Sequence, residues 1–147
     1  MVVWSTETAR REVTLTKSGR AWFSPDGRWL IGGSPTAYRL WEVSTWKPGP
    51  VFPTDLPGRD AGFLAFAQGG RLVAVLGHDD SFHILQFPEG RELVRLEPPF
   101  SLDAQGVAFS EDGSRLWVLG AGNRMFEWDL SALRSELAKS GLDWMEP

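Results

Sequence analysis

The sequence contains no cysteine, only two histidines and no long uninterrupted apolar run. The absence of cysteine excludes disulfides and thiolate metal sites, although it does not define a redox compartment. No segment reaches the roughly 20 apolar residues that a membrane-spanning helix needs. Residues 1–4 lead directly into polar residues, so no signal peptide is expected. We therefore expect a cytoplasmic protein with no membrane partner.

An excess of positive charge is also absent. The chain has 15 basic and 19 acidic residues, and the basic ones are scattered rather than gathered in a stripe. A nucleic-acid partner is therefore not expected. Large aromatic residues are abundant instead, with eight tryptophans and nine phenylalanines among 147 residues. Such side chains usually anchor packed cores, and the length suffices for one domain with a core of its own.

One short motif occurs three times at an interval of 43 residues. Its copies, FSPDGR, FAQGGR and FSEDGSR, begin at Phe23, Phe66 and Phe109. The interval lies within the roughly 40 to 45 residues of a four-stranded propeller blade. Each Asp-Gly or Gly-Gly is typical of a tight hairpin, because glycine adopts positive φ without strain.

Runs of β-forming residues surround each motif, so the motif is predicted to join two strands. The predicted first and second strands are 20–23, 29–31, 63–66, 72–76, 106–109 and 116–119. Alternating apolar and polar residues predict third strands at 38–43, 82–87 and 124–130. More polar edge strands are predicted at 49–52 and 92–96, and none follows the third copy.

The motif at 23–28, Leu-Trp-Glu at 40–42 and Glu-Trp-Asp-Leu at 127–130 resemble WD40 repeats. The resemblance implies an all-β fold, a partial WD40-type β-propeller of about three four-stranded antiparallel blades in an open array, with a short C-terminal helix. The positions that carry the repeat are Trp4, Phe23, Gly27, Trp41, Phe66, Gly70, Leu85, Phe109, Gly113 and Trp128. Trp4, Trp41 and Trp128 recur at one blade position, so we interpret them as core residues. The repeats depart from the family pattern, since the Gly-His pair is missing and Leu85 replaces a tryptophan.

This interpretation divides the chain into five segments. They are the last two strands of an incomplete blade (1–17), blade 1 (18–57), blade 2 (58–100), blade 3 without its fourth strand (101–130), and a helix with a tail (131–147). In the helix we expect Ser131 to cap the N-terminus, Leu133 and Leu137 to share one face, and Gly141 to end it. The ending also resembles that of WD40 proteins of planctomycete-like bacteria, many of which carry a protein-kinase domain upstream.

An array of about three blades cannot close into a ring alone, because closed propellers need four to eight. Two explanations stay open. The favoured one makes the chain the C-terminal part of a longer propeller, with the remaining blades in cis. In the other, a second copy in trans completes the ring as a self-associating half-propeller.

No catalytic, cofactor or metal site is predicted. His78 and His83, with Asp79 and Asp80, suggest a metal site or a general base, but we interpret 78–80 as a solvated turn. No Gly-x-Ser-x-Gly elbow is present, and neither histidine has a credible serine partner in sequence context. The glycine-rich segments at 32–34 and 120–123 do not match a phosphate loop. We therefore expect no enzyme.

The predicted function is a non-catalytic scaffold for protein–protein interaction, with a protein partner bound by loops on one rim of the blades. The candidate rim residues are Arg59, Asp60, His78, Asp79, Asp80, Asp103 and Asn123. An alternative is the regulatory or sensing C-terminus of a bacterial serine/threonine protein kinase. The self-associating half-propeller is the other.

Overall fold

The computed structural model describes residues 1–15, 19–53, 62–67, 69–77 and 80–142. Among these residues the fold is all-β, with four antiparallel sheets of two to four strands and one short C-terminal helix, which confirms the predicted all-β class with antiparallel, blade-like sheets. The chain forms two compact units, Met1–Ala61 and Gly62–Pro147.

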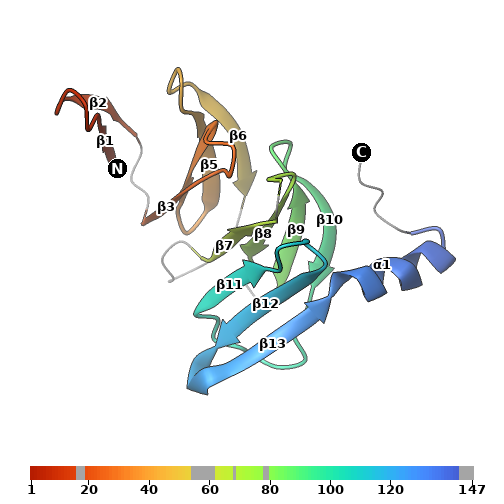
Figure 1. The fold of residues 1–147 in the computed structure, drawn as a ribbon. Coiled ribbons are helices and arrows are strands. Elements are labelled where there is room, and N and C mark those ends of the chain that lie inside the picture. Colours follow the sequence, from red (N-terminus) through yellow and green to blue (C-terminus); the bar gives the residue numbers. More distant parts are fainter. Residues whose placement is uncertain (16–18, 54–61, 68, 78–79, 143–147) are drawn as a thin grey trace. The chain divides into compact units, whose positions relative to one another are not determined.

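Unit 1 contains a two-stranded sheet and a four-stranded sheet. The two-stranded sheet is formed by β1 (Val2–Trp4) and β2 (Arg11–Thr14). The four-stranded sheet has the order β3 (Arg20–Phe23), β4 (Trp29–Gly33), β5 (Ala37–Glu42) and β6 (Pro48–Pro53) (Figure 1). Leu15, Leu30 and Trp41 are buried in a common cluster, and Val3 and Val13 pack against it. The two sheets of this unit therefore pack against each other through this cluster.

Unit 2 contains a four-stranded sheet, a three-stranded sheet and the helix. The four-stranded sheet is formed by β7 (Leu64–Phe66), β8 (Leu72–Leu76), β9 (Phe82–Gln86) and β10 (Arg91–Leu96). The three-stranded sheet is formed by β11 (Gly106–Phe109), β12 (Arg115–Gly120) and β13 (Arg124–Asp129), with a 3-10 turn at Ala121–Asn123. Helix α1 (Leu130–Lys139) continues from the end of β13 (Figure 1). The core between these elements is formed by Ala74, Leu76, Phe82, Ile84, Leu96, Leu102, Ala104, Leu116, Val118 and Leu130.

The hairpin turn between the first two strands is the same in all three larger sheets. Gly27, Gly70 and Gly113 adopt φ values of 71°, 70° and 70°, as the sequence predicted. In each turn the glycine N–H donates to the carbonyl of the residue three positions earlier. The left-handed conformation is nearly free for glycine alone, so it explains why the motif ends in glycine.

A serine and an aspartate add a side-chain network in the first and third turns. Ser24 Oγ donates to Asp26 Oδ1 at 2.6 Å, and Ser110 Oγ donates to Asp112 Oδ1 at the same distance. The Ser110 hydroxyl, together with the backbone N–H and hydroxyl of Ser114, lowers the pKa of Asp112 to about 2. These bonds stabilise the ionised carboxylate and hence the turn.

The helix begins one residue earlier than predicted, and its cap is a different residue. Asp129 is the N-cap, and its Oδ1 accepts from the Ala132 N–H at 2.8 Å, so the expectation of a Ser131 cap is wrong. Asp129 takes this role because it is the last residue of β13, where the extended backbone leads directly into the first turn. Gly141 ends the helix at φ 69°, as predicted, and Leu133 packs against the core of unit 2.

The repeated tryptophan position is not uniformly part of the core. Trp41 is only 5% exposed and Trp128 is half-buried, but Trp4 is 61% exposed. The expectation that all three are core residues is therefore wrong for Trp4. Its strand places it on the opposite side from Val3, which packs against the cluster of unit 1.

Candidate functional site

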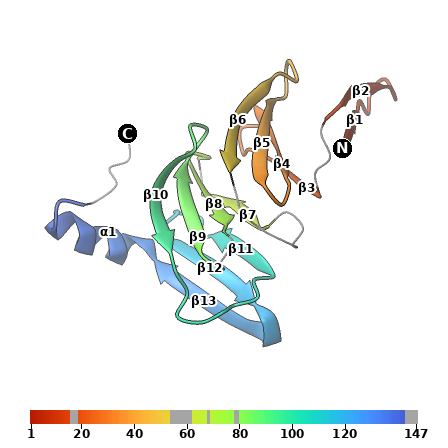
Figure 2. The same cartoon turned by 180° about the vertical axis from the view of Figure 1, so that it is seen from behind.

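Three connections of unit 2 meet at one end of its sheets, and we call this end the rim. It comprises residues 80–81 before β9, 97–105 between β10 and β11, and 121–123 between β12 and β13. The Ser101 hydroxyl donates to Asp80 Oδ2 at 2.6 Å, and the Ala121 N–H donates to the Leu102 carbonyl at 3.0 Å. Figure 2 shows the connection from β10 to β11 running past the turn between β12 and β13. Two hydrogen bonds thus join three connections that are distant in the sequence.

Each connection of the rim contains an Asp or Asn in a left-handed conformation. Asp80, Asp103 and Asn123 adopt φ values of 60°, 44° and 58°. For residues with a side chain this conformation costs about 1–2 kcal/mol, although Asp and Asn tolerate it best. Such strain persists only where the surrounding structure imposes it, and it concentrates at functional sites.

Close backbone contact is one reason why the rim keeps this shape. A Cβ atom at Gly120 would lie 2.6 Å from the Leu102 carbonyl oxygen, so only glycine allows the two connections to approach each other. The Ala121–Leu102 hydrogen bond forms at this point of contact. The rim is therefore fixed by main-chain packing as well as by the Asp80–Ser101 bond.

The structure separates the predicted rim residues by role. Asp80 is only 7% exposed, which corrects the expectation that it belongs to a solvated turn, because Ser101 binds its carboxylate. Asp103 and Asn123 are exposed. The other predicted residues lie outside the described part of the chain, and they are Arg59, Asp60, His78 and Asp79.

Aromatic and cationic side chains beside the rim were missed by the sequence analysis. Phe100 is 46% exposed, and its ring meets the ring of Phe126 edge to face, with 4.8 Å between centroids. The guanidinium carbon of Arg124 lies 5.5 Å from the centroid of the Phe100 ring. Exposed aromatic and arginine side chains held in place by neighbours are typical of the residues that dominate binding energy at protein interfaces. The two prolines before Phe100 mark a loop, but the stacking depends on tertiary contacts.

His83 is the centre of a second polar network in unit 2. Its Nδ1 lies 2.7 Å from Glu92 Oε2, and its Nε2 lies 3.1 Å from Ser81 Oγ. The expectation that neither histidine has a serine partner is therefore wrong for His83. The order serine, histidine and carboxylate is that of a hydrolase relay, but Ser81 is fully buried and no substrate can reach its hydroxyl. The network joins β9, β10 and the residues before β9.

No metal site is found in the parts of the chain that the structure describes. Among those residues no three histidine, cysteine, aspartate or glutamate side chains are grouped so that they could hold a metal ion. The described part of the chain also has no helix long and apolar enough to cross a membrane.

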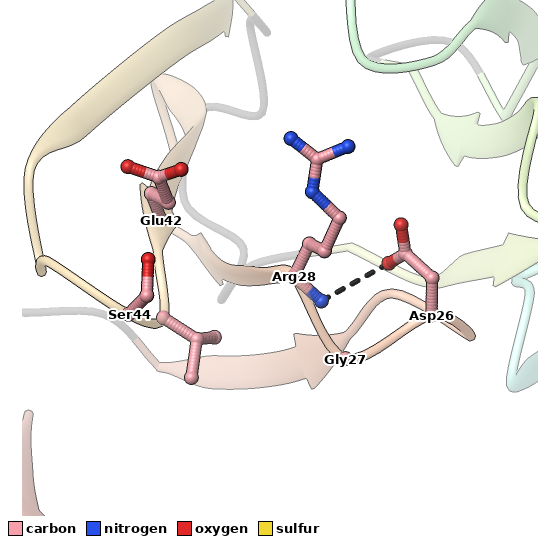
Figure 3. Close-up of a pocket in the computed structure, with 6 residues that line it drawn as sticks. Asp26, Gly27, Arg28, Glu42 and Ser44 are labelled. Carbon is pink, nitrogen blue, oxygen red and sulfur yellow. Dashed lines mark hydrogen bonds between the residues drawn. The ribbon is translucent and has the colours of Figure 1, made fainter.

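An open pocket of about 220 Å³ lies beside the first hairpin turn, in unit 1. The side chain of Arg28 lies between those of Asp26 and Glu42 (Figure 3). The Ser24 hydroxyl and then the Arg28 backbone N–H lower the pKa of Asp26, while Glu42 Oε2 accepts from Thr45 at 2.8 Å. One guanidinium faces two carboxylates, so the pocket lacks the positive excess that a phosphate or carboxylate ligand needs.

One residue that lines the pocket, Val43, occupies a position that recurs in the other two repeats. The N–H of Val43 donates to the Arg28 carbonyl at 2.8 Å, and Phe87 and Leu130 make the equivalent bonds at the other two hairpins. Phe87 and Leu130 are buried, whereas Val43 is smaller and lines the pocket.

No protein-family model and no curated protein matches this sequence.

Proposed function

We propose that the chain is a non-catalytic scaffold of WD40-type blades that binds another protein through the rim of unit 2. The observation that carries this proposal is the rim itself, where two hydrogen bonds hold three connections and two of them present the exposed residues Asp103 and Asn123. A preformed surface loses little conformational entropy on binding, so its contacts contribute more fully to affinity.

The residues around the rim favour a protein partner. Phe100 and Arg124 provide an exposed aromatic ring and a cation, while Asp103 and Asn123 provide polar groups. An apolar centre with polar surroundings is the usual composition of a protein interface. A nucleic acid would require a cluster of cations, and the net charge of the chain is −4.

Support for the WD40-type assignment comes from the repeats. The hairpin turns recur at 43 residues, two of the larger sheets have four antiparallel strands in sequential order, and the third has three. The missing Gly-His pair is a departure from the family pattern, so we take the partner-binding residues from the rim geometry and not from the family.

The test compares two rim variants with a matched control. Phe100→Ala and Arg124→Ala remove the exposed ring and its cation, and Glu111→Ala changes an exposed residue of the β11–β12 turn, at the opposite end of the same sheet. The three variants and the wild-type chain are immobilised, and captured proteins are quantified by mass spectrometry. Interface residues of this kind contribute about 2 kcal/mol or more, so we expect at least a roughly 30-fold loss of a specific partner with the rim variants alone.

The binding partner identified in this way is then purified and its Kd measured by calorimetry. Equal affinity of the two rim variants and the control for every captured partner contradicts the proposal. Circular dichroism of each variant shows whether the fold is retained, so a loss of binding can be separated from a loss of structure.

A further inference from the structure

The guanidinium of Arg124 is held in place from two sides. Its Nε–H donates to the Ala121 carbonyl at 3.2 Å, and its central carbon lies 5.5 Å from the centroid of the Phe100 ring. The residue is nevertheless exposed, so a ligand in solution can reach it. Because the planar group is already oriented, it loses little conformational freedom when it binds.

The aromatic ring beside this guanidinium is itself anchored to the core of unit 2. Phe100 meets Phe126 edge to face, with 4.8 Å between the ring centroids. Phe126 packs against the core, and its cross-strand partner Val118 is fully buried. Two aromatic rings therefore connect the position of the Arg124 guanidinium to the packed interior.

Arg124 differs from other basic residues of unit 2 in its lack of an acidic partner. Arg95, Arg115 and Lys139 each form an ion pair with a glutamate, whereas among the residues that the structure describes no carboxylate pairs with Arg124. The two Nη groups of a guanidinium present parallel N–H donors that match the two oxygens of a carboxylate. Arg124 thus offers these donors in a fixed orientation.

The charges around Arg124 favour a carboxylate ligand over a phosphate. The charged residues of the rim connections are Asp80, Glu97 and Asp103, and all three are acidic. A phosphate group carries about 1.5 to 2 negative charges at pH 7 and binds best opposite several cations. A carboxylate carries a single charge, so the one guanidinium of Arg124 is sufficient to balance it.

We propose that Arg124 binds a carboxylate of the protein partner, while the exposed Phe100 ring contacts an apolar side chain beside that carboxylate. The carboxylate belongs to an aspartate or glutamate side chain or to a C-terminus, since each offers two oxygens and one charge. This inference rests on the proposed binding at the rim, and it adds the chemical group that the partner must present.

The probes are two pools of random synthetic peptides, one with free C-termini and one with amidated C-termini. Peptides retained by the immobilised full chain are sequenced by mass spectrometry. An acidic residue beside an apolar one, enriched from both pools, identifies a side-chain carboxylate. Enrichment from the free pool alone identifies a C-terminal carboxylate. Either result supports the inference, whereas enriched peptides that share no carboxylate, or a chain that retains no peptide, overturn it.

The Kd of one retained peptide is then measured for the wild type and for variants whose circular dichroism is unchanged. Arg124→Gln should weaken binding about tenfold, and Arg124→Lys should restore only part of the loss, because it keeps the charge but not the paired donors. Arg115→Gln is the matched control. Arg115 belongs to the same sheet and already pairs with Glu127, so its replacement should leave the Kd unchanged.

Replacing the carboxylate of the peptide by an amide shows whether Arg124 is its partner. The amide should weaken binding to the wild type about tenfold and leave binding to Arg124→Gln unchanged, because the interaction is already absent there. An equal loss with both proteins overturns the inference, even where Phe100→Ala still weakens binding and the rim is the binding surface. A peptide whose binding is indifferent to Phe100→Ala contradicts the proposed function itself.

Discussion

Leu116 and Leu119 lie on the same strand but on opposite faces, and this pair gives a quantitative test of how unit 2 is packed. The Leu116 side chain is fully buried between the two sheets, whereas Leu119 is 45% exposed. Replacing a fully buried leucine by alanine costs about 3–4 kcal/mol, because apolar contacts are lost and a cavity remains. The half-exposed Leu119 has about half of its burial to lose, so Leu119→Ala should cost about 1 kcal/mol.

Urea denaturation followed by tryptophan fluorescence measures this difference. With a slope of about 2 kcal/mol per molar urea, Leu116→Ala should lower the midpoint by about 1.5–2 M and Leu119→Ala by about 0.5 M. Equal midpoints for the two variants would refute the placement of Leu116 and Leu119 on opposite faces of the sheet.

Three further predictions concern the turns and the helix. Gly120→Ala should lower the unfolding midpoint and weaken amide protection throughout the rim, because the new Cβ would lie 2.6 Å from the Leu102 carbonyl; unchanged hydrogen exchange contradicts this. The pKa of Asp112 is lowered from 3.8 to about 2 in the folded chain, so its carboxylate contributes stability above pH 3.8 that is lost as the pH falls toward 2. Asp112→Asn should therefore flatten the dependence of the urea midpoint on pH between these two values. Asp129→Ala should speed amide exchange in the first turn of the helix more than Ser131→Ala does, whereas the reverse order would restore the serine cap.

The strands and hairpins could be predicted because their signals are local. Alternating apolar residues and a turn glycine repeated every 43 residues identify each strand within a residue or two of its observed bounds. The capping residue of the helix was harder to predict from the sequence. Asp129 and Ser131 are both good capping residues two positions apart, and only the end of β13 decides between them.

The side-chain networks depend on contacts that the sequence does not reveal. Asp80 is bound by Ser101, which lies 21 residues away, and His83 reaches Glu92 only because β9 and β10 pair. The pairing of these strands shifts between Glu92 and Val94, so a regular register could not have predicted which carboxylate faces the histidine. The candidate residues at the rim were predicted from their positions in loops alone. The structure shows that one of them, Asp80, is buried and therefore has a structural role.

The recurrence of similar sheets every 43 residues has a consequence for how such a chain can change in length. A segment of 43 residues brings one sheet with two faces, so its duplication would add one more interface between sheets of the kind that each unit already contains. No new kind of interface is needed, because each added segment interacts only with its neighbours. Growth or shortening by whole segments is therefore the simplest change open to this architecture.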